Sequence, residues 1–203
     1  NTGDDEIFHG LHVSPDLDSV TYALAGLTNP DTGWGVANDS FRTLQALGRL
    51  GADTWFGLGD IDFATHIRRT ALLSEGLSLS EATAEITHHL GIACTMAPMT
   101  DAPVRTVAIT DVGDLAFQEY FVHRACEPRI AGIRFDGVDS AQPSVAFGEA
   151  LRQADAIVYC PSNPVVSTGP ILAIPGVRRA IEGFAGPRIA VSPIVGGQAL
   201  RGP

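Results

Sequence analysis

Apolar residues recur at helical spacing in the first half of the chain. Phe41, Leu44, Leu47 and Leu50 stand at every third position between residues 37 and 51, and the segment ends at a glycine. Three polar residues of the capping type come just before the first of them. A capped start, a regular apolar face and a terminal glycine together predict a helix over residues 37–51.

Two more helices are predicted farther along. Residues 62–75 place Phe63, Ile67 and Leu72 on one side of a helix. Ser78 and Glu81 then have the spacing of a capping box, ahead of a third apolar-periodic segment.

The middle of the chain has the pattern of strands. Two β-rich runs, Val104–Thr110 and Leu115–Val122, flank the polar residues 111–114. Strand-forming runs joined by a short turn of this composition are typical of a β-hairpin.

The last third alternates helices and short apolar strands. Helices are predicted near 143–153 and 175–184, and apolar strands over 156–160 and 188–192. Continuous apolar strands that alternate with helices indicate a parallel sheet covered on both faces. We therefore predict one α/β domain over residues 1–203, with a mainly parallel sheet and a β-hairpin excursion. Cys160, at the end of an apolar strand, is expected in the core.

Composition restricts the possible functions. The 203 residues include 23 acidic and 13 basic side chains, a formal net charge of −10, which argues against a general nucleic-acid binder. No apolar run is long enough to span a bilayer, so no membrane association is expected. Three widely spaced cysteines are typical of reduced thiols in a cytoplasmic protein. The chain also begins without Met, and we expect it to be a piece of a longer protein.

Five carboxylates crowd the first eighteen residues: Asp4, Asp5, Glu6, Asp16 and Asp18. Both clusters stand in loop-like sequence before any helical pattern begins. Hard oxygen ligands of this kind suit magnesium, which takes one or two protein carboxylates and completes its shell with water and phosphates. The alternative is a solvated acidic turn, a common feature of protein surfaces.

A polar loop follows the apolar strand at 156–160. It gathers hydroxyls, an amide and backbone N–H groups ahead of a helix, in Ser162, Asn163, Thr168 and Gly169. Such a loop lies at the carboxyl end of a strand, where α/β sheets bind ligands, and it can hold a phosphate or a ribose. The alternative is a rigid connector with capping residues.

Residues 57–62 form a third acidic loop, followed by His66 and Arg69 on a predicted helix. The loop either belongs to a site or is a strand-to-helix turn in which Asp62 caps the helix. His66 is interpreted as a structural packing residue. Arg69 either clamps a phosphate or pairs with Asp62.

These motifs stand in an order typical of one family. They are Asn1-Thr2-Gly3-Asp4-Asp5, Ser14-Pro15-Asp16-Leu17-Asp18 with Tyr22, Gly33-Trp34-Gly35, Gly59-Asp60-x-Asp62-x-Ala64-Thr65-His66, Phe117-Gln118-Glu119, Pro161-Ser162-Asn163-Pro164 through Gly169-Pro170-Ile171, and Ser192-Pro193-Ile194. Over essentially its whole length the chain resembles the 2-phospho-L-lactate transferase and phosphoenolpyruvate transferase family of coenzyme F-420 biosynthesis.

The resemblance implies a Rossmann-like three-layer fold and a magnesium-dependent transferase. A phospholactyl or phosphoenolpyruvyl group would pass from a guanosine diphosphate conjugate to the ribityl hydroxyl of the deazaflavin Fo, and GMP would leave. In phosphoryl transfer, positioning and charge neutralisation carry most of the rate, and a metal ion between phosphates and carboxylates supplies part of that neutralisation.

The resemblance also implies roles for individual residues. The metal ligands would be Asp4, Asp16 and Asp18, and the catalytic residues Asp18 and Asp4. The substrate-binding residues would be Asp18, Gly57, Arg69, Ser162, Asn163, Thr168 and Gly169. Among them, Asp18 and Gly57 would lie beside the deazaflavin, and Gly57 stands where many relatives carry Lys.

The chain departs from the family pattern in several places. A glycine-rich strand-loop is expected upstream of Asn1 and a further segment after Pro203, and neither is in this sequence. Ile61 and Ala125 stand where arginine is common in the family. Homodimers are usual for such folds. The alternative function is a non-catalytic, nucleotide-sugar-binding regulator of the same fold, against which the Ser-Pro-Asp-Leu-Asp motif argues.

Overall fold

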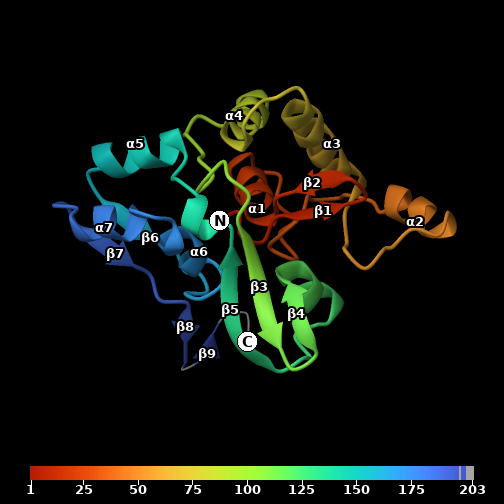
Figure 1. Ribbon diagram of the computed structural model, residues 1–203. Coiled ribbons are helices and arrows are strands. Elements are labelled where there is room, and N and C mark those ends of the chain that lie inside the picture. Colours follow the sequence, from red (N-terminus) through yellow and green to blue (C-terminus); the bar gives the residue numbers. More distant parts are fainter. Residues whose placement is uncertain (197, 200–203) are drawn as a thin grey trace. The chain divides into compact units, whose positions relative to one another are not determined.

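The computed structural model describes residues 1–196 and 198–199, and the chain forms two compact units. The helical unit comprises residues 4–97 and 118–125. The sheet unit comprises residues 1–3, 98–117 and the chain from Cys126 onward. Figure 1 shows the course of the chain through both units. The mixed α/β class is confirmed, whereas the single domain stays a prediction. Residue 197, in the segment after the strand predicted over 188–192, lies outside the described residues.

The helical unit opens with a short hairpin. Strand β1 (Glu6–Phe8) pairs antiparallel with β2 (Leu11–Val13). The two residues between them, His9 and Gly10, have φ values of 53° and 75°, the left-handed conformation that a two-residue hairpin turn requires. Helix α1 (Pro15–Leu24) follows directly.

Asp16 and Asp18 lie in the first turn of α1. The prediction that they stand in a loop before any helix is therefore wrong. Pro15 presets the backbone for the first helical position, and carboxylates beside the N-terminal amides of a helix are stabilised by its dipole. The acidic residues at this point are thus themselves a helix-start signal.

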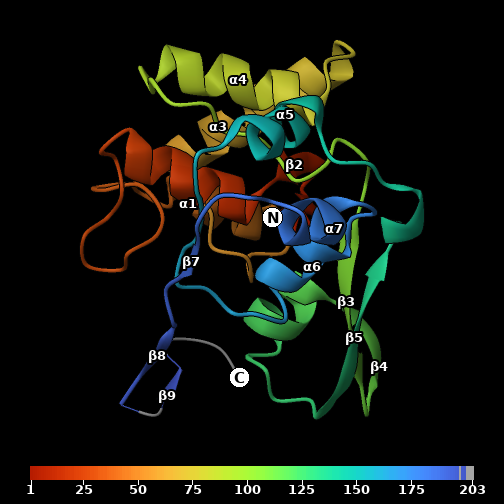
Figure 2. The same ribbon diagram turned by 90° about the vertical axis from the view of Figure 1, so that its left-hand side faces the viewer.

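The three predicted helices are confirmed, with shifted ends. They are α2 (Arg42–Arg49), α3 (Asp60–Ser74) and α4 (Leu79–His89), and Figure 2 shows α3 and α4 next to one another. The first is shorter than the predicted 37–51, and the second begins two residues earlier than predicted.

The capping box of α4 is confirmed. Glu81 N–H donates to Ser78 Oγ over 3.2 Å, and Ser78 N–H donates to Glu81 Oε2 over 2.7 Å. Because both contacts join residues three positions apart, the sequence alone identified them.

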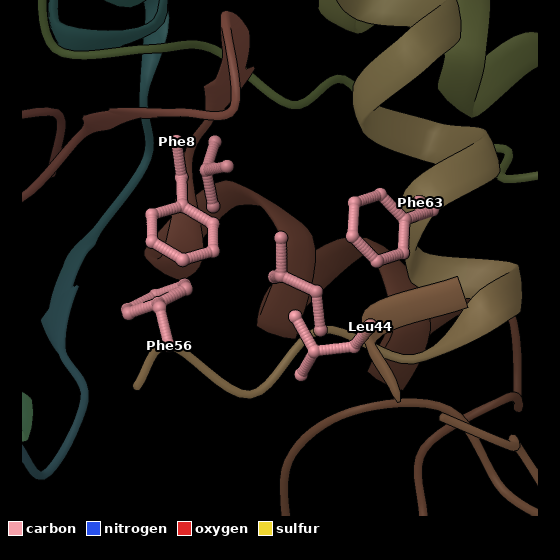
Figure 3. Packing of buried hydrophobic residues seen from close by; sticks show 6 residues of the cluster. Phe8, Leu44, Phe56 and Phe63 are labelled. Atoms are coloured by element: carbon pink, nitrogen blue, oxygen red, sulfur yellow. The ribbon is translucent and has the colours of Figure 1, made fainter. Parts of the chain in front are cut away.

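The core of the helical unit joins the hairpin to the helices. Its buried members are Phe8, Val13, Leu44, Phe56, Leu58 and Phe63. Figure 3 shows the rings of Phe8 and Phe56 beside each other, with Leu44 and Phe63 on the far side of the cluster. Leu44 of α2 and Phe63 of α3 thus pack with the hairpin, as predicted. Phe41, Leu50 and Ile67, which were predicted on the same apolar faces, are exposed.

The sheet unit is built on an antiparallel sheet. Strand β3 (Arg105–Thr110) lies between β4 (Gly113–Ala116) and β5 (Ile130–Asp136). The predicted hairpin is confirmed for β3 and β4. The second strand ends at Ala116 rather than at residue 122, because the chain next enters a π-helical turn, η1 (Glu119–His123), that belongs to the helical unit.

The rest of the sheet unit alternates helices with short strands. Its elements are η2 (Val138–Ser140), α5 (Val145–Gln153), β6 (Ile157–Tyr159), α6 (Thr168–Ala173), α7 (Val177–Glu182), β7 (Arg188–Ala190), β8 (Ile194–Val195) and β9 (Gln198–Ala199). A buried cluster that includes Met99, Val104, Ile174 and Val177 packs against β6 and these helices.

The prediction of a mainly parallel sheet is wrong. Within the described residues, β6 and β7 form the one parallel pair, and the larger sheet is antiparallel. A parallel pair needs a crossover connection, which α6 and α7 supply, whereas the two-residue turn after β3 forces an antiparallel neighbour. Val158 and Ile189 oppose each other on an exposed face of the parallel pair. Cys160, one pleat farther along, is likewise exposed and not in the core.

In the part of the chain that the structure describes, no helix has the length and apolarity that a membrane crossing requires.

Candidate active site

Asp18 and Arg69 form a buried ion pair between α1 and α3. Arg69 Nη1 donates to Asp18 Oδ2 over 3.1 Å, and Arg69 Nη2 donates to Asp18 Oδ1. The two residues are 4% and 2% exposed. A two-pronged contact of this kind fixes the orientation of both groups as well as their distance. The arginine that the sequence offered either to a phosphate or to Asp62 thus pairs with Asp18.

Three further side chains extend this ion pair. His66 Nδ1 lies 3.5 Å from Asp18 Oδ2 and 3.4 Å from Arg69 Nη1, and His66 Nε2 lies 3.3 Å from Asp62 Oδ1. The hydroxyl of Tyr22 donates to Asp62 Oδ1 over 2.6 Å. We call Asp18, Tyr22, Asp62, His66 and Arg69 the Asp18 cluster.

Helical spacing explains how the Asp18 cluster assembles. Asp62, His66 and Arg69 are four and three residues apart on α3, so their side chains share one face of that helix. Asp18 and Tyr22 are four residues apart on α1 and share a face of it. Both helices turn these polar positions inward, where Asp18 pairs with Arg69 and Tyr22 binds Asp62, while His66 Nε2 and Arg69 Nε have no hydrogen-bond partner among the described residues.

Burial and charge set the protonation of this cluster. Burial raises the pKa of Asp18, and the charge and hydrogen bonds of Arg69 oppose that shift. Burial disfavours the charge of Arg69, yet the attraction of Asp18 raises the pKa of Arg69 overall. Burial and the neighbouring carboxylates of Asp18 and Asp62 raise the pKa of Tyr22, which keeps its hydroxyl a hydrogen-bond donor.

The other predicted carboxylates lie at the start of the same unit. Asp4 and Asp5 are both buried, and Asp5 Oδ2 lies 2.9 Å from His12 Nε2. Burial raises the pKa of Asp4 well above its usual range, and the charges of Asp16 and Asp5 raise it further. Gln118 Nε2 donates to the backbone carbonyl of Asp4 over 3.1 Å.

The acidic residues fit the magnesium ion that the resemblance implies. Asp4 and Asp16 repel each other electrostatically, and a divalent cation relieves repulsion between carboxylates. Among the described residues, the ligand atoms of Asp18, Asp62 and His66 also lie within 4.8 Å of one another. In that second group, however, Asp18 already has a cationic partner in Arg69. Asp18 is thus ion-paired with Arg69 of α3, whereas Asp16 interacts electrostatically with Asp4.

The predicted phosphate loop belongs to the sheet unit. Asn163 Oδ1 accepts from the N–H groups of Val165 and Val166 over 2.9 and 3.2 Å, and the Asn163 carbonyl accepts from the N–H groups of Ser167 and Thr168. The loop is therefore wound around Asn163, and this amide side chain has a structural task in it.

The end of this loop is tightly packed. Thr168 begins α6, and a Cβ on Gly169 would lie 3.2 Å from the ring of Phe135 and 3.4 Å from the carbonyl of Pro164. Ser162, Asn163, Thr168 and Gly169 thus stand in one compact turn, and their binding roles stay predictions.

The acidic loop over residues 57–62 starts α3. Asp62 does not cap this helix through its own side chain. Instead, Asp39 Oδ1 accepts from Ile61 N–H over 2.9 Å, and Asp39 Oδ2 accepts from Asp62 N–H over 3.2 Å. Gly59 leaves room for that carboxylate, because a Cβ there would overlap the side chain of Asp39. Gly57 is exposed and has open space around its Cβ position.

Sequence reasoning counted Tyr22 in the family motif without a role, and it missed the pairing of Asp18 with Arg69. Arg69 follows Asp18 by 51 positions, and no local pattern states which helix faces meet. The usable signal was the polar spacing on α3, because three ionisable residues on one helical face need partners when that face is buried.

The family model described as 2-phospho-L-lactate transferase CofD matches residues 1–202. The chain belongs to this family. A 2-phospho-L-lactate transferase of Methanopyrus kandleri is 44% identical over 204 residues, and a phosphoenolpyruvate transferase of Streptomyces coelicolor is 44% identical over 208 residues. Each alignment covers 100% of this chain but 65% of the relative, so the CofD-family chain spans about two thirds of the length of these relatives.

Solved structures show the fold of this family member. A protein of the UPF0052 family from Bacillus halodurans superposes with a TM-score of 0.61, covering 93% of this chain and 58% of that protein. A second structure of the same Bacillus halodurans protein gives 0.58. Sequence identity is 17% in both, so the likeness concerns the fold alone.

Proposed function

We propose that the full-length protein is a transferase of coenzyme F-420 biosynthesis. It moves a phospholactyl or phosphoenolpyruvyl group from a guanosine diphosphate conjugate to the deazaflavin Fo, and it releases GMP. The observation that carries this proposal is family membership over residues 1–202, joined to equal identity with relatives named for each of the two groups.

The proposed reaction is a substitution at phosphorus. The ribityl hydroxyl of Fo forms a new bond to the phosphorus that bears the three-carbon group, and the bond from that phosphorus to the bridging oxygen of GMP breaks. The hydroxyl proton goes to the carboxylate of Asp18, and the electron pair of the broken bond leaves with GMP. General-base help of this kind is worth about 10²–10⁴ in rate.

The acidic residues at the start of the helical unit would serve the phosphates. Asp4 and Asp16, with Asp18, would hold a magnesium ion, which supplies charge neutralisation at the phosphates when it is bound. Asp4 also belongs to the proposed catalytic residues. The burial of Asp4 near the charges of Asp16 and Asp5 supports this assignment, because a cation stabilises carboxylates that repel each other.

The remaining contacts follow the predicted roles. Ser162, Asn163, Thr168 and Gly169 would bind the nucleotide and its phosphates through hydroxyl and backbone N–H groups. Gly57 would approach the deazaflavin with its backbone, since it offers no side chain. The homodimer, the cytoplasmic location and the Rossmann-like three-layer arrangement stay predictions.

The proposal is tested by incubating the full-length protein with Fo, magnesium and each donor in turn. We expect GMP to appear in equal amount to a modified deazaflavin, with one donor preferred. No GMP from either donor would contradict the proposal. Tight binding of a nucleotide sugar without binding of Fo would instead support the non-catalytic regulator.

A further inference from the structure

Every hydrogen bond described for the guanidinium of Arg69 goes to the protein itself. Its two terminal nitrogens reach both oxygens of Asp18, the backbone carbonyl of His12 and the ring of His66. The side chain is 3% exposed. A guanidinium in this environment presents its charge to Asp18 rather than to a ligand in solution.

The contact with Arg69 leaves part of the hydrogen-bonding capacity of the Asp18 carboxylate unused. A carboxylate has about four lone-pair directions, and a two-pronged arginine occupies one on each oxygen. The plane of the guanidinium fixes the plane of the carboxylate, and with it the directions of the remaining lone pairs. An acceptor hydroxyl bound along one of them would meet a base of defined orientation.

Arg69 is itself held on several sides. His12 in β2 fixes one terminal nitrogen by its carbonyl over 3.2 Å. His66, one turn earlier on α3, lies against the same nitrogen and is backed by Asp62, which Tyr22 binds in turn. Strand β2 and helices α1 and α3 thus all contribute to the orientation of one carboxylate.

We infer that Arg69 is a positioning residue, which orients Asp18 for the attack of the acceptor hydroxyl and does not itself contact substrate. This inference rests on the proposed function. It assigns Arg69 a role in orienting Asp18 in place of the predicted role as a clamp on a phosphate. Misplacement of a reacting group by about 1 Å can cost about 100-fold in rate, so the orientation has a measurable consequence.

Three roles for Arg69 predict different kinetics. A direct clamp on the donor would bind ground state and transition state alike, so its loss would raise KM with little change in kcat. A purely structural counter-charge would tolerate lysine, which keeps the charge. A positioning residue would lose kcat even with lysine, because an ammonium is a point charge without the planar two-pronged geometry.

The decisive variant is Arg69→Lys in the full-length protein, assayed by GMP release with the preferred donor. We expect kcat to fall at least about 10-fold while KM for donor and for Fo stays within about twofold. The matched control is Arg68→Lys on the same helix, because Arg68 is half exposed and pairs with Glu85 on the surface over 3.2 Å. That control should keep wild-type kcat.

A second variant tests the same point by rescue. Arg69→Ala removes the guanidinium, and added guanidinium chloride at millimolar concentration should restore part of kcat, with no such gain in wild type or Arg68→Ala. If Arg69→Ala does not fold, as judged by thermal unfolding, Arg69→Lys decides alone. Wild-type kcat in a folded Arg69→Lys, or a rise confined to KM, would overturn the inference. An inactive wild-type protein would overturn the proposed function together with it.

Discussion

Asp39 and Asp60 exchange helix caps: Asp39, just before α2, caps α3, and Asp60, the first residue of α3, caps α2. The carboxylate of Asp39 accepts backbone N–H groups at the start of α3, where Asp60 is the first residue. The carboxylate of Asp60 accepts the N–H groups of Arg42 and Thr43 at the start of α2, over 3.3 and 2.8 Å. This exchange ties two helix starts together at the acidic loop that leads into the Asp18 cluster.

Gly59→Ala should break one half of this exchange. The new Cβ would overlap the side chain of Asp39, so that carboxylate must leave the start of α3. Loss of a helix cap costs about 0.5–2 kcal/mol. The control is Gly57→Ala, since a Cβ there meets nothing within 4 Å. Urea unfolding should show a lower midpoint for the first variant only, and equal midpoints would contradict the assigned cap.

Asp60 should make stability depend on acid pH. Hydrogen bonds from the Ser40 hydroxyl and the Thr43 N–H lower the pKa of Asp60 from its ordinary 3.8 to about 2. Because the folded pKa lies below the unfolded one, ionised Asp60 stabilises the fold above about pH 4, and this contribution is lost as pH falls towards about 2.

The measurement is the difference in unfolding free energy between wild type and Asp60→Asn across that range. The difference should shrink as the solution becomes more acidic. The exposed Asp53→Asn serves as control. A difference between wild type and Asp60→Asn that stays constant from pH 5 to pH 2 would refute the cap.

Phe63 should be essential to the core of the helical unit. It is 4% exposed and packs in the cluster with Phe8, Leu44 and Phe56. Phe63→Ala should cost about 3–5 kcal/mol, the usual cost of emptying a large buried site. Ile61→Ala, two residues earlier and about half exposed, should change stability by no more than about 0.5 kcal/mol. Similar thermal midpoints for the two variants would show that α3 packs by another face.

Magnesium should stabilise the protein through Asp4. A ligand that binds the folded state alone raises the free energy of unfolding, by about 2.7 kcal/mol at 100 times its dissociation constant. We expect magnesium chloride to raise the thermal midpoint of the full-length protein and to leave Asp4→Asn almost unchanged. Sodium chloride at equal ionic strength is the control. An equal rise of the thermal midpoint in both proteins would show that Asp4 is not a ligand of the magnesium ion.

The sequence was most informative where structure is local. The capping box joining Ser78 to Glu81 and the turn between β3 and β4 depend on neighbours within a few residues, and both were predicted. The start of α2 was placed too early, because Asp39 looked like a cap of its own helix but binds α3, about twenty residues away.

Long-range pairing set the limit of prediction. Strand β5 has glycine and arginine among its apolar residues and was not expected, since its identity depends on β3 being available as partner. The same holds for Asp18, whose acidic neighbours suggested a metal ligand. The structure adds an arginine 51 residues away, which no spacing rule connects to it.

The proposed reaction depends most on Asp18, and GMP release by Asp18→Asn is its sharpest test. The substitution keeps the size of the side chain and removes its charge. With wild-type and variant full-length proteins compared under saturating Fo, donor and magnesium, we expect turnover to fall at least about 100-fold, as for loss of a general base. Folding should be checked by circular dichroism. Turnover close to wild type in a folded variant would show that Asp18 is not the general base.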